Sequence, residues 1–292
     1  MSTVEIAGPL LSARIRPRGA EPCSLRDAAG EEYLWQAGPE WPRHAPLLFP
    51  VVGRLAGDAL RVGGAAHRMG QHGFARDLDF AVVESRAASC RLMLQDSAAT
   101  REAFPFAFRL DAEYAIRDAT LACAWTVLNT GEGPLPFSFG AHPAFRWPLP
   151  GSTAKAGHRI EFEQEETGPA HRLKDGLLDP APAAWPVRGR ILGLREELFR
   201  EDAIVLPRTA SRRLRYAAPG GAALDLAWQG FSALGLWMRP GAAFLCIEPW
   251  AGHADPLGFE GDVFQKPGIE VLAPGESRRF GLRVTPSRQP AR

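Results

Sequence analysis

The sequence predicts an all-β protein, a sandwich of antiparallel strands with a few short helices. Two observations lead to this fold class. Short segments in which apolar and polar residues alternate recur along the 292 residues, and Gly, Pro, Asp and Asn separate them. Helical periodicity is rare, and none of it resembles the crossover helices that parallel strands require.

The clearest element is an antiparallel hairpin over residues 108–129. Residues 117–119, Arg-Asp-Ala, supply the turn between two alternating runs. Apolar residues of one parity fill both arms: Phe108, Leu110, Ala112, Tyr114 and Ile116 in the first, and Leu121, Cys123, Trp125 and Val127 in the second. Further strands are expected over 90–95, 159–164, 212–218, 222–229, 233–238, 243–249 and 278–286.

Helices are expected at only two places. Residues 96–104 can begin with Asp96 or Ser97 as the N-cap and must end near Pro105. Residues 194–202 form a second short candidate. The stretch 147–193 is rich in Pro and Gly and contains one clear strand, so long loops are expected there. No composition break or repeat divides the chain, and we expect one domain over residues 1–292.

Charge and cysteine usage narrow the class of partner. The chain has 34 basic and 33 acidic residues, a net charge of +1 and no long block of one sign, which argues against nucleic acid or a membrane as the partner. Four scattered cysteines fit neither a zinc site nor a disulfide framework: Cys23, Cys90, Cys123 and Cys246. Because no signal peptide or long apolar span is evident, we expect a soluble cytoplasmic protein.

Two residues that precede a proline are the strongest candidates for chemistry. Glu248 follows the apolar run 244–247 and precedes Pro249, and His142 precedes Pro143 in the segment FSFGAHPAF. A residue before proline favours an extended conformation, and proline cannot donate to a sheet ladder. We therefore expect each side chain at a strand end, where Glu248 faces a cleft and not the dry core.

Other polar residues lie in two further motifs, LLFPVVGRL (47–55) and QHGFAR (71–76). They contain Arg54, His72 and Arg76. Each of these residues, like Glu248 and His142, also has a purely structural interpretation as an ion-pair member, a capping residue or a core residue. Their occurrence together favours a functional site.

The motifs FPVVGRL, QHGFARDLDF, SFGAHPAF and CIEPWAGHAD, in this order, resemble those of the aldose 1-epimerase (mutarotase) family. The nearest branch is that of the bacterial LacX-like proteins and hexose-phosphate mutarotase relatives. The resemblance extends from about residue 10 to residue 284. It implies a galactose mutarotase-like β-supersandwich that binds a sugar on its concave face.

The same resemblance implies roles for individual residues. His142 would be the general acid and Glu248 the general base of anomer interconversion, with the charge of Glu248 favouring a protonated His142. Substrate-binding roles would fall to Arg54, His72, Arg76 and Asp202, the two arginines being placed to bind a phosphate in phosphosugar relatives. The resemblance implies no metal or organic cofactor, a small-molecule sugar or sugar phosphate as partner, and a monomer or homodimer.

Three alternatives remain open from the residues themselves. His72, His142 and Glu248 could form a two-histidine, one-carboxylate metal site, although the chain lacks an HxH pair. A glycoside hydrolase or lyase would need a second carboxylate, for which Asp202 and Asp255 are available. The chain could also bind or sense a carbohydrate without catalysis, with Trp147, Trp237 or Trp250 stacking on the sugar.

Overall fold

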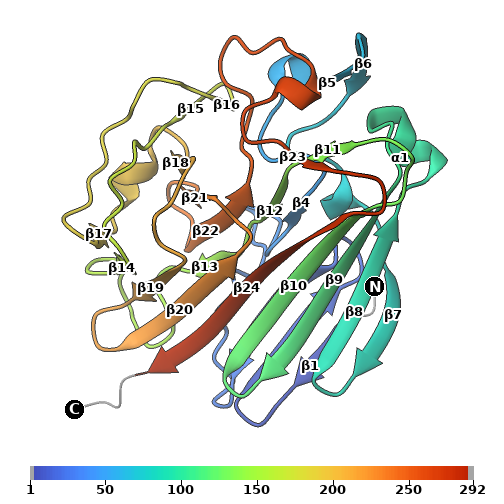
Figure 1. The fold of residues 1–292 in the computed structure, drawn as a ribbon. Helices are drawn as coiled ribbons and strands as arrows, with labels where there is room; N and C mark the ends of the chain where they lie inside the picture. Colours follow the sequence, from blue (N-terminus) through green and yellow to red (C-terminus); the bar gives the residue numbers. More distant parts are fainter. Residues whose placement is uncertain (1–2, 289–292) are drawn as a thin grey trace.

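The computed structural model describes residues 3–288 and has the all-β architecture that the alternating segments predict. Its strands are antiparallel and form two large sheets with several small ribbons (Figure 1). The hairpin expected over 108–129 is present as β9 and β10, which pair from Phe108 with Asn129 to Arg117 with Thr120. The alternation predicted this pairing because one face of each strand is buried.

The strands and helices follow in chain order. They are β1 (Val4–Ala7), β2 (Leu11–Arg16), β3 (Glu21–Asp27), β4 (Leu47–Leu48), η1 (Ala56–Asp58), β5 (Ala59–Val62), β6 (Ala65–Arg68), η2 (Ala75–Asp77), β7 (Ala81–Arg86), β8 (Ser89–Gln95), α1 (Ala98–Ala103), β9 (Phe108–Arg117), β10 (Thr120–Asn129), β11 (Leu135–Phe137), β12 (Phe139–Ala141), β13 (Ala144–Arg146), β14 (Arg159–Phe162), β15 (Leu173–Lys174), β16 (Leu177–Leu178), β17 (Ile191–Gly193), η3 (Glu196–Phe199), β18 (Ile204–Leu206), β19 (Arg213–Ala217), β20 (Ala222–Gln229), β21 (Ala233–Trp237), β22 (Phe244–Ala251), η4 (Val263–Gln265), β23 (Glu270–Leu272) and β24 (Ser277–Arg288).

The larger sheet has nine strands in the order β17-β14-β19-β20-β24-β10-β9-β8-β7. Its long strands cross the lower half of Figure 1 side by side. The second sheet has the order β18-β21-β22-β12-β4, and β13 also pairs with β22. This second sheet carries the candidate site.

Aromatic side chains join the two sheets. Phe139 of β12 stacks on Phe280 of β24 with ring centroids 4.9 Å apart, and Trp125 of β10 lies 5.7 Å from Phe139. All three side chains are buried. Burying large aromatic rings contributes strongly to core stability, so this contact holds β12 and the segment that follows it against the larger sheet.

The expected helices are small. Ser97 caps α1, which ends before Pro105 as predicted, whereas the second candidate forms only the single 3₁₀ turn η3. The stretch 147–193 contains four short strands, β14 to β17, and not one. Three of these have only two or three residues, which is too short for an alternating pattern to reveal. Within residues 3–288, no helix is long and apolar enough to cross a membrane.

Candidate active site

A cavity of about 360 Å³ opens over the second sheet and brings together most of the predicted site residues. Five of the six line it: His72, Arg76, His142, Asp202 and Glu248. Its remaining walls are formed by Trp41, Gly53, Gln71, Leu173, Leu178, Ala203, Val205, Trp237, Arg239, Trp250 and Ala254. A volume of this size is typical of small-molecule sites.

Glu248 lies inside strand β22 and not at its end. The strand continues through Pro249 to Ala251, and the Glu248 side chain is 1% exposed, so the expected strand-end position is wrong. Pro249 has no N–H to donate to a neighbouring strand. It is tolerated because β12 ends and β13 has yet to begin beside it, at His142 and Pro143, so no ladder hydrogen bond is needed there. The carboxylate still faces the cavity, because the pleat turns it away from the core.

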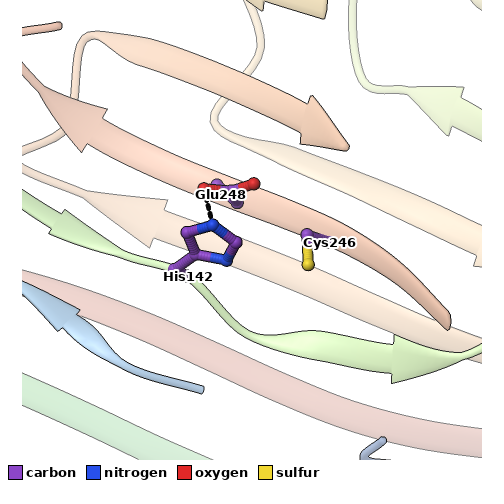
Figure 2. A group of neighbouring side chains, drawn as sticks. All are labelled: His142, Cys246 and Glu248. Atoms are coloured by element: carbon purple, nitrogen blue, oxygen red, sulfur yellow. Dashed lines mark ion pairs between the residues drawn. The ribbon is translucent and has the colours of Figure 1, made fainter. Parts of the chain in front are cut away.

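His142 is placed beside Glu248 by the end of β12. Its backbone N–H donates to the carbonyl of Pro46 at 3.1 Å, directly after the pairing of Ala141 with Leu47. The His142 Nε2 atom lies 3.1 Å from Oε2 of Glu248, as Figure 2 shows. Two atoms at this site, Glu248 Oε2 and His142 Nδ1, are buried without a well-formed hydrogen bond to a described residue. Such atoms are costly unless a ligand or a proton transfer uses them.

Burial dominates the titration of this pair. It lowers the pKa of His142 to about 3, and the positive charges of Arg76 and Arg43 add to the effect. Burial raises the pKa of Glu248 well above its usual value, which the Trp250 indole partly opposes. The expectation that the charge of Glu248 favours a protonated His142 is therefore wrong, since desolvation dominates the titration of this imidazole. These shifts favour a neutral His142 beside a protonated Glu248.

His72 forms a second imidazole wall of the cavity. Its ring lies edge-on to that of His142, with centroids 5.6 Å apart. The backbone N–H of Gly53 donates to Nδ1 of His72 at 3.1 Å, so the neutral ring carries its proton on Nε2. Burial lowers the pKa of His72 well below its usual value. His72 is therefore a fixed, neutral hydrogen-bond donor.

The two predicted arginines lie apart. Arg76 lines the cavity, and burial lowers its pKa to about 10, with Arg43 nearby. Arg54 lies in an adjoining recess, where it binds Asp58 through two contacts of 2.7 and 2.9 Å. Gln71 and Asp202 border both hollows. The cavity contains a different second arginine, Arg239, which the sequence motifs did not reveal.

Aromatic rings enclose the reacting pair. Trp41 stacks on His142 with centroids 5.0 Å apart and planes 25° apart, and Trp237 meets the same imidazole edge-on. Trp237 and Trp250 line the cavity, whereas Trp147 packs on Phe199 elsewhere. Trp41 could not be found from sequence, because it precedes a proline in an irregular segment without any periodic pattern.

The acidic residues of the hydrolase alternative have separate environments. Asp202 is exposed at the cavity wall, and its carboxylate accepts the N–H of Ala203 at 2.8 Å. Asp255 is buried and paired with Lys266 at 2.6 Å, and it does not line the cavity. Asp255 is therefore unavailable as a second carboxylate for the hydrolase chemistry.

One group of side chains near the cavity could contact a metal ion. Ligand atoms of His142, Cys246 and Glu248 all lie within 4.8 Å of one another, with Cys246 two residues before Glu248 on β22 (Figure 2). His72, expected in such a site, is not a member. A thiol must lose its proton to bind metal, and burial raises the pKa of Cys246 well above its usual value. This group is therefore better suited to moving a proton between its imidazole and carboxyl.

Comparisons with known proteins show the family and the fold. A family model described as aldose 1-epimerase matches residues 2–179. The plasmid protein LacX of Lactococcus lactis subsp. lactis is 29% identical over 301 residues, covering 97% of this chain and 99% of that protein. A galactose mutarotase related enzyme from Lactobacillus acidophilus is 30% identical with a TM-score of 0.89, over 99% of both chains. A galactose mutarotase-like protein from Lactobacillus casei ATCC 334 is 28% identical with a TM-score of 0.92, over 98% of this chain and 100% of that one.

Proposed function

The chain belongs to the aldose 1-epimerase family, and we propose that it is a mutarotase, an isomerase that interconverts the α and β anomers of a hexose or hexose phosphate. One observation carries the proposal. Nε2 of His142 and Oε2 of Glu248 lie 3.1 Å apart at a cavity that three tryptophans and several polar side chains line. Anomer interconversion needs an acid and a base side by side, because O1 and O5 are bonded to the same carbon.

Ring opening needs three proton transfers, and the reverse transfers close the ring. A proton moves from Glu248 to His142 across their contact and gives the carboxylate and imidazolium that the reaction uses. Glu248 then takes the proton of the O1 hydroxyl while His142 donates its proton to O5, the C1–O5 bond breaks, and C1 becomes an aldehyde. Rotation about C1–C2 and the reverse transfers close the ring as the other anomer.

The surrounding residues would bind and orient the sugar. The rings of Trp41, Trp237 and Trp250 offer apolar faces on which a sugar can stack. His72 would donate from Nε2 to a sugar oxygen, and Asp202 would accept from a hydroxyl. Excluding water around a buried acid–base pair also strengthens its interaction with the developing charges.

The arginines bear on whether the substrate is phosphorylated. Arg76 and Arg239 both line the cavity, and Arg76 has only a 3.7 Å contact with the half-exposed Asp77, so their positive charges support binding of an anionic substituent there. Arg54 is already paired with Asp58 and would reach only a substituent that extends into the recess, where it would bind sugar hydroxyls. Equal activity on glucose and glucose 6-phosphate would limit these arginines to hydroxyl binding.

The test is polarimetry of freshly dissolved α-D-glucose and α-D-galactose, with NMR anomer exchange on glucose 6-phosphate. Glu248→Gln should lower the catalysed rate about a hundred- to ten-thousand-fold, the usual scale of positioned acid–base catalysis. Glu113→Gln, on the larger sheet and paired with Arg279, is the matched control and should keep full activity. Saturable sugar binding by the wild type without mutarotation would instead indicate a carbohydrate-binding or sugar-sensing protein.

A further inference from the structure

A buried ion pair lies behind the cavity and takes no part in the proposed proton transfers. Nζ of Lys266 lies 2.6 Å from Oδ1 of Asp255, and the two side chains are 1% and 3% exposed. Neither residue lines the cavity. Burying two charges is seldom favourable for stability alone. The contacts of this pair therefore matter, because they indicate which segments it holds in place.

Asp255 holds the segment that follows Gly53. Its second oxygen, Oδ2, accepts the N–H of Ala56 at 2.9 Å, and its own backbone N–H donates to the carbonyl of Arg54 at 2.9 Å. The side chain of Asp255 therefore fixes Ala56, and its backbone fixes Arg54, so both ends of this short segment are held by one residue. Lys266 occupies the remaining carboxylate oxygen and leaves Asp255 no alternative orientation.

Lys266 is itself held in place from its own side. It follows the 3₁₀ turn η4, which begins with a capping box formed by Asp262 and Gln265. The N–H of Lys266 donates to the carbonyl of Val263 at 3.2 Å. The ammonium group thus approaches Asp255 from a fixed turn, and burial lowers its pKa only partly because Asp255 opposes the shift.

The held segment connects directly to His72. Gly53 adopts a positive φ of 73°, and a Cβ atom there would lie 2.5 Å from that of Ala254, the neighbour of Asp255. Gly53 and His72 exchange two hydrogen bonds, from Gly53 N–H to Nδ1 at 3.1 Å and from His72 N–H to the Gly53 carbonyl at 2.8 Å. A shift of this segment would therefore release Nδ1.

We infer that Asp255 and Lys266 are positioning residues for His72. Their buried pair fixes the segment after Gly53, the Gly53 N–H occupies Nδ1, and the ring proton is kept on Nε2 as a donor for the sugar. The expected effect on catalysis rests on the proposed function. The tautomer of His72 does not, because it can be measured on the protein without a substrate.

The test is a thermodynamic cycle on mutarotation. The double variant Asp255→Asn/Lys266→Met removes both charges and retains an amide oxygen for the Ala56 N–H. It should lower kcat/KM about 10- to 100-fold in the wild-type background, the effect expected of a misplaced binding group. In the His72→Ala background the same change should have no further effect. A matched control, Lys155→Met/Glu196→Gln, removes an ion pair of 2.6 Å away from the cavity and should leave kcat/KM unchanged.

Nitrogen-15 NMR of the His72 ring supplies a readout that needs no activity. The wild type should show Nε2 protonated and Nδ1 as the acceptor, and Asp255→Asn/Lys266→Met should show a mixture of tautomers. An unchanged tautomer, or an equal loss of kcat/KM with and without His72, would overturn the inference. If the wild type lacked mutarotase activity, the proposed function would fail while the NMR result would still decide this inference.

Discussion

Gly235 and Trp250 lie on the paired strands β21 and β22, and the indole ring of Trp250 covers the Cα atom of Gly235. Gly140 on the other neighbouring strand is covered in the same way, since a Cβ there would lie 2.7 Å from Cδ1 of Trp250. Two glycines on flanking strands thus let a large ring lie flat on the sheet beside Glu248. A side chain at either position would collide with the Trp250 ring, which lines the cavity.

Gly235→Ala should therefore damage the site more than the fold. The added methyl group would push the Trp250 ring into the cavity, and overpacking of this kind costs about 1–3 kcal/mol. We expect kcat/KM to fall at least tenfold while circular dichroism remains that of the wild type. Gly193→Ala is the matched control, because Gly193 is also a strand glycine but has no atom near its Cβ position. Full activity of Gly235→Ala would show that Trp250 does not shape the site.

Removing the ring that covers His142 should raise the pKa of that imidazole. Burial holds this pKa at about 3, and Trp41 stacks on the ring, so Trp41→Ala would admit water and move the pKa towards 6.5. NMR titration of His142 measures the shift. Trp185→Ala, which removes an indole packed on Phe162, should leave it unchanged. An unaltered His142 pKa in Trp41→Ala would contradict the stated role of Trp41 in desolvation.

The pH dependence of catalysis should lack the acid limb expected of an ordinary histidine. In the active pair Glu248 is protonated and His142 is neutral, and activity is lost when His142 binds a further proton. Because its pKa is lowered to about 3, that loss begins far below 6.5, and kcat/KM should be flat from neutral pH to about pH 5. At high pH, activity should fall as the raised pKa of Glu248 is passed and this carboxyl loses its proton. An acid limb near 6.5 would refute a neutral His142 beside a protonated Glu248.

Stability should fall as the pH drops below 6.5. His72 and His158 each accept a backbone N–H on a ring nitrogen, from Gly53 and Leu149, and burial lowers the pKa of both. Burial also lowers the pKa of His142 and His253, so below pH 6.5 the unfolded chain gains protons at four histidines, which outweighs the opposite effect of the raised pKa of Glu248 and favours unfolding. Each pH unit of acidification lowers the free energy of unfolding by up to about 1.4 kcal/mol per histidine.

Urea unfolding at pH 7.5 and 5.5 measures this effect. The midpoint should be lower at pH 5.5, and His158→Gln should reduce the difference between the two midpoints. His67→Gln, a change at the surface ribbon β6, should retain the full difference. A midpoint that rises on acidification would contradict the sign of the argument.

Local patterns were sufficient for the longer strands and for the site motifs. The alternation in residues 108–129 predicted β9 and β10 because a sheet with one buried face requires it. The motif residues His72, Arg76, His142 and Glu248 do gather at one cavity, together with Asp202, which the family resemblance implied. Arg54 was predicted by the same kind of argument, but its partner Asp58 draws it into the adjoining recess.

The sequence by itself therefore determined the all-β fold, the resemblance to aldose 1-epimerases and the chemical groups at hand, because side-chain periodicity and residue type are local properties. Only the tertiary structure decided that Glu248 lies within β22 and that Trp41 covers His142. It also decided that desolvation of His142 outweighs the expected attraction between this imidazole and the charge of Glu248. Exposure and distance depend on which segments meet in space. Trp41, His142 and Glu248 are far apart in the chain, and no local pattern encodes their contact.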